Sequence, residues 1–182
     1  KQHLELCRDI AQKFNNEYKR PDFLRPPEPL IQTHFSRIMS LRDGTKKMSK
    51  SDVAEGSRIN LTDTEDQIIN KIKKAKTDND TLPGNEGRLK DRPEAENLMG
   101  IYSSLSNQNI TDTLNEFEGK NFSYLKNKLS EIIVAKLSPI SKEIKKLLSD
   151  KNYIDEILKN GAAKAQDISS KKVKKIKEIV GF

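Results

Sequence analysis

Apolar residues recur at helical spacing along most of this 182-residue chain, and the pattern predicts a mainly α protein. The first periodic run covers residues 2–19 and stops before Pro21. The prolines within 25–29 exclude a helix there and predict an extended segment. A short apolar run at 37–41 predicts a brief strand, and the polar stretch 42–57 after it predicts a loop.

Beyond residue 60 the pattern changes to helices joined by polar turns. Thr62 and Glu65 have the spacing of a capping box, which predicts that a helix starts there. The stretch 77–93 contains Pro and Gly residues and predicts a surface loop. Pro93 suits the first turn of the helix that follows this loop.

The last third of the chain also predicts helices. A short helix is expected from Thr111 to Gly119. The clearest apolar stripe in the sequence follows it, and Pro139 is expected to kink or break that helix. Asp150 is suited to cap a further helix that Gly161 ends, and one more helix closes the chain. We place a domain boundary near residue 60, between a mixed part, 1–60, and an all-helical part, 61–182.

Composition narrows the class of protein without deciding its function. The formal charge of +7 suits a protein that meets phosphate, although solubility alone also explains an excess of this size. The single cysteine, Cys7, excludes an internal disulfide and favours a reducing compartment, so we expect a cytoplasmic protein. No apolar run approaches the roughly 20 residues of a membrane helix, so no membrane partner is expected.

The candidate chemistry lies in the polar loop, at Lys47-Met48-Ser49-Lys50-Ser51. Two lysines separated by small or flexible residues can both turn toward one phosphate group, and each ammonium offers three hydrogen-bond donors. The serine hydroxyls and loop N–H groups can add further donors. A solvated basic turn without any site explains the same five residues equally well.

The flanks of this loop distinguish the two interpretations. Lys47 to Ser51 match the KMSKS motif of class I aminoacyl-tRNA synthetases at every position, and the whole chain resembles the bacterial-type tryptophanyl-tRNA synthetases in particular. The resemblance is carried, in family order, by Lys1-Gln2-His3-Leu4-Glu5-Leu6, Ser36-Arg37-Ile38-Met39-Ser40-Leu41, Asp43-Gly44-Thr45-Lys46, Asn97-Leu98, Ile101-Tyr102, Phe117-Glu118-Gly119-Lys120, Gly161-Ala162 and Gly181-Phe182.

This resemblance implies a fold and a reaction. The fold is mainly α: the C-terminal remnant of a Rossmann-type (HUP-like) α/β nucleotide-binding domain, followed by a helical bundle that binds the tRNA anticodon region. The reaction is that of a tryptophan–tRNA ligase, in which ATP and tryptophan give an adenylate and pyrophosphate before transfer to tRNA(Trp). The resemblance also implies a homodimer for the complete enzyme.

The resemblance also assigns roles to individual residues, according to their positions in the family's motif. The resemblance implies that Lys47 and Lys50 are catalytic and stabilise charge on the ATP phosphates. It further implies that Ile38, Met48, Ser49 and Ser51 help to bind ATP, with Met48 near the nucleoside. Mg²⁺ is expected to accompany ATP, and no residue of this chain is expected to be a metal ligand.

Two departures from the family pattern limit these expectations. Val53 stands where many members have proline, so the loop is expected to be freer here. The HIGH motif and the tryptophan-recognition residues of the family are absent from this sequence, so we expect a C-terminal half that does not activate tryptophan by itself. A tyrosyl-type synthetase fragment and a free-standing helical RNA-binding module with a vestigial phosphate loop are the alternative interpretations.

Other candidate groups favour structural roles. His3 and Cys7 lie one helical turn apart, but with only His34 besides them a closed zinc site cannot be assembled, and we expect Cys7 to be packed. The lysines of the final helix are most simply a solvated face, and they are also candidates for tRNA phosphate contact. They are Lys164, Lys171, Lys174 and Lys175.

Overall fold

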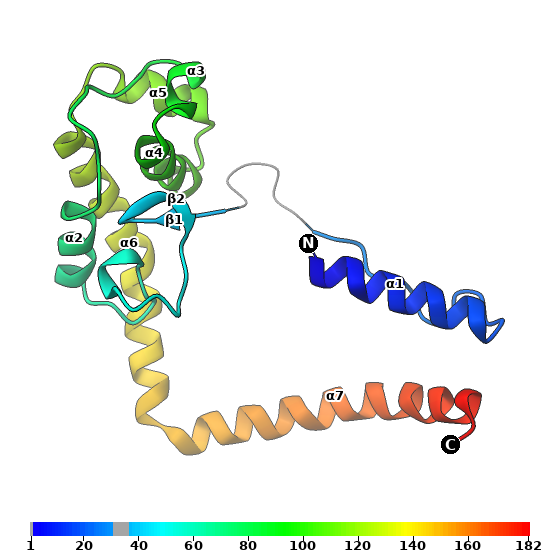
Figure 1. The fold of residues 1–182 in the computed structure, drawn as a ribbon. Coiled ribbons are helices and arrows are strands. Elements are labelled where there is room, and N and C mark those ends of the chain that lie inside the picture. The colour runs from blue at the N-terminus through cyan, green and yellow to red at the C-terminus, as the bar shows by residue number, and fades with distance from the viewer. Residues whose placement is uncertain (1, 31–36) are drawn as a thin grey trace. The chain divides into compact units, whose positions relative to one another are not determined.

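The computed structural model of the chain describes residues 2–30 and 37–182, and it is mainly helical, as predicted (Figure 1). The described residues form two compact units. One consists of 2–30 together with 150–182, and the other of 37–149. The predicted boundary near residue 60 concerns a division by function and stays a prediction.

In the first unit, helix α1 (Gln2–Glu17) packs against the segment that follows it. The chain reverses through Lys19, which adopts a positive φ of 50°, and α1 therefore ends before the predicted residue 19. The side-chain amide of Asn15 then bonds both the N–H and the C=O of Leu24, each at 2.9 Å. The Arg8 guanidinium donates to the Pro27 carbonyl at 2.8 Å, which holds the proline-rich segment along the helix.

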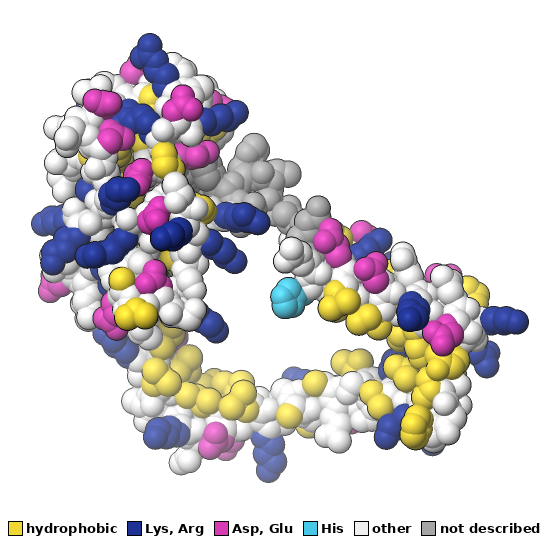
Figure 2. All heavy atoms as spheres, viewed as in Figure 1, with side chains coloured by type: hydrophobic (Ala, Val, Ile, Leu, Met, Phe, Trp, Pro, Cys, Tyr) yellow, Lys and Arg dark blue, Asp and Glu magenta, His cyan; other side chains and the backbone are white. Residues whose placement is uncertain are grey.

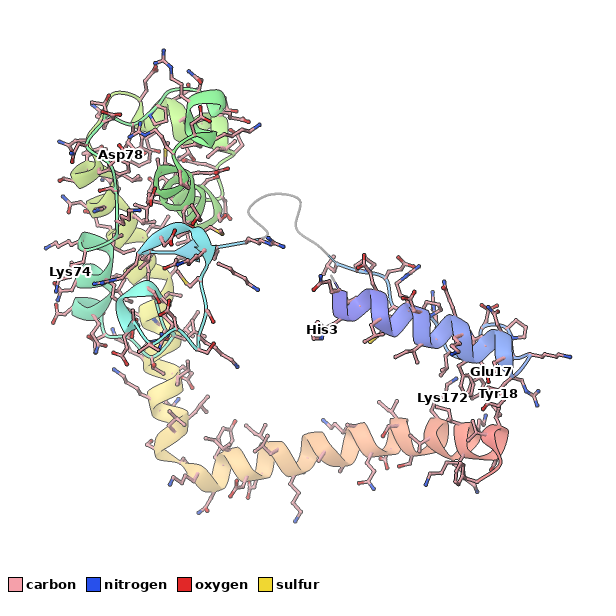
Figure 3. The ribbon with its side chains drawn as sticks, viewed as in Figure 1. His3, Glu17, Tyr18, Lys74, Asp78 and Lys172 are labelled. Atoms are coloured by element: carbon pink, nitrogen blue, oxygen red, sulfur yellow. The ribbon has the colours of Figure 1, made fainter. Side chains whose placement is uncertain are left out.

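Helix α7 (Lys151–Val180) is the other part of this unit, and it is one helix where the sequence predicted two. The Asp150 carboxylate accepts from the Tyr153 N–H and caps the helix, as predicted. Gly161 does not end it, because glycine in a helix interior costs only about 1 kcal/mol relative to alanine and the alanines that follow favour the helix. Near the other end, the Lys172 ammonium donates to the Phe23 carbonyl and lies 3.8 Å above the Phe23 ring (Figure 3).

The second unit is a helical bundle with one small sheet. Helix α6 (Phe122–Ser149) packs against α2 (Glu65–Lys73) and α4 (Pro93–Ser106). Helix α4 also contacts α3 (Glu86–Lys90), α5 (Ile110–Phe117) and strand β2 (Asp43–Lys47), which pairs antiparallel with β1 (Met39–Ser40). The largest fully buried apolar side chains are Leu41, Ile68, Ile72, Leu98, Met99, Leu114, Phe117, Leu125, Leu129 and Ile133.

The capping box of α2 lies two residues after the predicted position. Thr64 is the N-cap: its hydroxyl accepts from the Gln67 N–H, while the Gln67 side chain accepts from the Thr64 N–H at 2.8 Å. Thr64 and Gln67 satisfy the same spacing rule as the predicted pair, Thr62 and Glu65. The later start is consistent with the burial of Ile68 and Ile72 in the core.

Three further sequence expectations differ in detail from the structure. Pro139 does not break α6, which continues to Ser149. The predicted loop 77–93 contains the short helix α3, capped by Asn85, although Pro93 does begin α4 as predicted. The short helix expected from Thr111 begins at Ile110, with Asn109 as its N-cap. No helix in the described part of the chain is long and apolar enough to cross a membrane.

Lys126 joins α6 to the end of α2 and supports a stability prediction. Its ammonium donates to the carbonyl of Lys73, the last residue of α2, at 3.2 Å, and to that of Ala75, just after the helix, at 2.7 Å. Burial lowers the pKa of Lys126, because desolvation penalises the ammonium form. Lys126→Met is expected to reduce the free energy of unfolding by about 1–2 kcal/mol, since those carbonyls lose their donor. Urea denaturation measures this.

The matched control for that prediction is Lys128→Met on the same helix. The Lys128 side chain is 42% exposed and, among the described residues, pairs only with Glu131 of its own helix. Such a surface pair contributes at most a few tenths of a kcal/mol. Equal urea midpoints for the two variants would contradict the assigned role of Lys126.

Candidate phosphate-binding loop

The predicted phosphate loop begins at the end of a β-hairpin. Lys47 is the last residue of β2 and pairs with Met39 of β1, and the Met48 N–H then donates to the Ile38 carbonyl at 3.0 Å. The predicted strand at 37–41 is therefore shorter than expected, and the predicted loop at 42–57 begins with a strand. Strand pairing thus holds the N-terminal end of the loop in place.

The hairpin is anchored in turn on helix α4. The Asn97 side chain donates to the Met39 carbonyl and accepts from the Met39 N–H, both at 2.8 Å, as a neighbouring strand would. Gly44 is buried against the first turn of α4, where an added Cβ would lie 2.6 Å from the Pro93 carbonyl carbon. Neither role is visible in the local sequence pattern, since the Asn97–Met39 contact, for example, spans 58 positions.

Lys47 and Lys50 are both exposed. Within the described part of the chain, neither ammonium has a hydrogen-bond or ion-pair partner, whereas the neighbouring Lys46 pairs with Asp43 at 3.3 Å. The hydroxyls of Ser49 and Ser51, on either side of Lys50, lie 3.0 Å apart. The loop therefore presents two unpaired positive charges and two hydroxyl groups to solvent.

The two apolar residues assigned to ATP binding differ in exposure. Ile38 is 47% exposed, next to the start of the loop. Met48 is half-buried, and its side chain packs against the hydrophobic core. Met48 therefore anchors the middle of the motif, and its predicted place near a nucleoside stays a prediction.

Two carboxylates flank the loop and are stabilised in the ionised form. The Thr45 hydroxyl and backbone N–H lower the pKa of Asp43 to about 2. The Ala54 backbone N–H, which donates to the Asp52 carboxylate at 2.9 Å, lowers the pKa of Asp52. Both carboxylates bond neighbouring backbone N–H groups, and in the described chain neither pairs with Lys47 or Lys50.

No metal site is formed by the residues that the structure describes: no three His, Cys, Asp or Glu side chains gather in a suitable group. His3 lies in the first turn of α1 (Figure 3), and His34 is outside the described residues. Cys7 is exposed at the edge of a hollow beside residues 22–27, so the expectation that it is packed was wrong.

Charged side chains of both signs lie on the face of the molecule that Figure 2 shows. Figure 2 shows Lys and Arg interspersed with Asp and Glu over the unit that contains the loop. The lysines proposed for tRNA contact all lie on α7, and their side chains are exposed to solvent. They are Lys164, Lys171, Lys174 and Lys175.

Comparison with known proteins places this geometry in a family. A family model described as "tRNA synthetases class I (W and Y)" matches residues 1–138. The whole chain is 48% identical over 200 residues to the tryptophan–tRNA ligase of Brucella melitensis, of which it covers 56%. It is 47% identical over 182 residues to that of Caulobacter vibrioides, of which it covers 53%. The chain thus spans about half the length of the curated relatives it matches.

Solved structures agree with the sequence matches. The tryptophanyl-tRNA synthetase of Mycoplasma pneumoniae superimposes on the whole chain with a TM-score of 0.81 at 28% identity, over 53% of its own length. That of Campylobacter jejuni, complexed with ADP and tryptophan, gives 0.65 at 26% identity over 54% of its length.

These matches confirm the expected fold class, a mainly α remnant of a Rossmann-like domain with a helical domain. The relatives quoted are tryptophan ligases, which favours the tryptophanyl interpretation over the tyrosyl one. The chain belongs to the class I tRNA synthetases of the tryptophan and tyrosine family, and it corresponds to a C-terminal portion of a bacterial tryptophanyl-tRNA synthetase.

Proposed function

We propose that this chain provides the ATP-phosphate loop and the tRNA-binding helices of a tryptophan–tRNA ligase. The observation that carries the proposal is the pair of exposed lysines, Lys47 and Lys50, without partners in the described chain, on a loop held by a hairpin that is anchored on α4. Unpaired ammonium groups on an anchored loop can stabilise negative charge as it shifts toward pyrophosphate, with little reorganisation during the reaction.

The roles within the loop follow from its geometry. Lys47 is positioned by strand pairing and Lys50 by the turn through Ser49 and Ser51. The serine hydroxyls supply additional donors to phosphate oxygens. Ile38 and Met48 provide apolar contact for ATP. Mg²⁺ would accompany ATP and neutralise phosphate charge, while the lysines and hydroxyls of this loop contact the phosphate oxygens.

The remaining assignments extend the same proposal. The part before residue 60 belongs to the nucleotide-binding domain, and 61–182 belongs to the helical region that meets tRNA(Trp). Tryptophan binds to the portion of the enzyme that the relatives have and this chain does not cover. The complete enzyme acts in the cytoplasm as a homodimer.

The proposal is tested with a chimera that places this chain in the Caulobacter vibrioides ligase, in exchange for the 182 residues that align with it. We expect the chimera to catalyse tryptophan-dependent ATP–pyrophosphate exchange and to charge tRNA(Trp). Both activities are measured with the parental ligase beside it.

A chimera carrying both Lys47→Ala and Lys50→Ala serves as the control for exchange that does not depend on the loop. A folded chimera without exchange activity would contradict the proposal. Exchange followed by charging of tRNA(Tyr) in place of tRNA(Trp) would favour the tyrosyl alternative.

A further inference from the structure

The end of the phosphate loop is held by a side chain that the motif does not include. Asp52 directly follows Ser51, and its backbone carbonyl accepts a hydrogen bond of 2.7 Å from the Arg58 guanidinium. The Nε–H of the same guanidinium donates to the Asn60 side-chain oxygen at 3.1 Å. Because the guanidinium is a rigid planar fork, the two bonds together fix its orientation and the position of the Asp52 peptide.

Asn60 connects Arg58 to a buried carboxylate. Its backbone N–H donates to Asp63 Oδ2 at 2.9 Å, and its side-chain NH₂ donates to Asp63 Oδ1 at 3.3 Å. The amide can face only one way, since its oxygen accepts from Arg58 while its nitrogen donates to Asp63. Replacement of Asn60 by aspartate would therefore break the connection, because a carboxylate has no N–H group to donate to Asp63.

Asp63 in turn is bound to helix α2. It is only 7% exposed, and the Lys71 ammonium lies 2.5 Å from its Oδ2. The Lys71 side chain is 13% exposed, so the pair is largely removed from water. A buried ion pair gives little net stability compared with apolar packing, but it fixes geometry closely. Since α2 packs on α6, this end of the chain of contacts is rigid.

We propose that Arg58 is a positioning residue for the phosphate loop, and that the linked side chains Lys71, Asp63, Asn60 and Arg58 hold the end of the loop to helix α2. We call these four residues the polar link. The link stops at a backbone carbonyl, so it orients the loop without using the charge of Lys47 or Lys50. Its effect on ATP rests on the proposed function, whereas its effect on the position of the loop does not.

The first test measures amide hydrogen exchange in the 182-residue chain. The reporters are the N–H groups of Asp52 and Ala54, which bond to the Ser49 carbonyl and the Asp52 carboxylate. Arg58→Gln is expected to raise their exchange rates about tenfold, the usual effect of losing one charge-assisted hydrogen bond. Lys71→Met, a substitution in α2 away from the loop, is expected to raise the exchange rates of the same two amides.

The matched control is Lys74→Met, which changes an exposed lysine at the C-terminal end of α2 (Figure 3). It should leave the loop amides at their original rates. Unchanged loop rates in Arg58→Gln, or a rise matched by the core amides of α6, would overturn the proposal. A rise in Arg58→Gln alone, with Lys71→Met equal to the control, would overturn the link to α2.

The second test separates positioning from catalysis in the chimeric ligase. A loop that spends less time in its binding position raises the apparent dissociation constant by the inverse of its occupied fraction. Arg58→Gln should therefore raise the KM for ATP about tenfold and leave kcat at saturating ATP nearly unchanged. A loss confined to kcat would overturn the positioning role. If Lys50→Ala had no effect on ATP–pyrophosphate exchange, the proposed function would be wrong. The amide hydrogen-exchange result would still decide whether the polar link holds the loop.

Discussion

Alanine at Lys47 or at Lys50 is expected to slow ATP–pyrophosphate exchange by about 10²–10³-fold in a ligase that carries this chain, as is typical when one preorganised donor to a developing charge is lost. Both ammonium groups are exposed and have no partner in the described chain, so neither contributes an internal contact whose loss would unfold the loop. The effect should appear in kcat more than in the KM for ATP, because charge shifts toward pyrophosphate in the transition state.

Lys46→Ala provides the matched control, since it removes a lysine directly beside the motif. Lys46 pairs with Asp43 at 3.3 Å, and its side chain is 79% exposed. Its loss is expected to change exchange only slightly. Exchange at the parental rate in both the Lys47 and Lys50 variants would show that the loop does not act on phosphate.

Gly44→Ala is expected to destabilise the second unit by about 3 kcal/mol, the upper end of the usual cost of overpacking. The added Cβ would lie 2.6 Å from the Pro93 carbonyl carbon and 2.7 Å from the Glu94 nitrogen, and these are backbone atoms that cannot rotate away. The hairpin must therefore separate from α4. Because β2 ends at Lys47, the same change should also slow exchange in the ligase.

Gly87→Ala is the control for that variant, since it adds the same methyl group within the same unit. Its Cβ would meet only the Asn85 side chain, at an ordinary contact distance of 3.5 Å. Urea denaturation of the two variants should give a large shift for Gly44 and little or none for Gly87. Equal midpoints would contradict the close approach between β2 and α4.

A pH prediction follows from the electrostatics near this contact. The Lys76 ammonium lies 2.9 Å from the Glu94 carboxylate and, as the largest cause, lowers the pKa of Glu94. A carboxyl group whose pKa is lowered by folding stabilises the folded state at pH values above its unfolded-state pKa. That stabilisation is lost as the pH falls through its folded-state pKa. We expect Glu94→Gln to flatten the loss of stability on acidification below about pH 4.5, measured by urea midpoints at several pH values.

The sequence by itself determined the helical class, most helix positions and the identity of the loop. Helical spacing of apolar residues is a local signal, so α1, α4 and the start of α6 were predicted close to their observed bounds. The family resemblance rests on short motifs, and these are also local. At α2 the predicted capping box, Thr62 with Glu65, was two residues early: the observed N-cap is Thr64, and Ile68 and Ile72 of the helix are buried in the core.

Only the tertiary structure decided how the loop is held. Two of the contacts that anchor it join residues far apart in the chain, Asn97 to Met39 and Gly44 to Pro93, and a third runs from Lys71 through Asp63 and Asn60 to Arg58. Such contacts leave no periodicity, and Gly161 and Pro139 show that even strong local signals yield when the rest of a helix is favourable. The motif predicts which charges meet phosphate, whereas distant polar and backbone contacts determine where those charges lie.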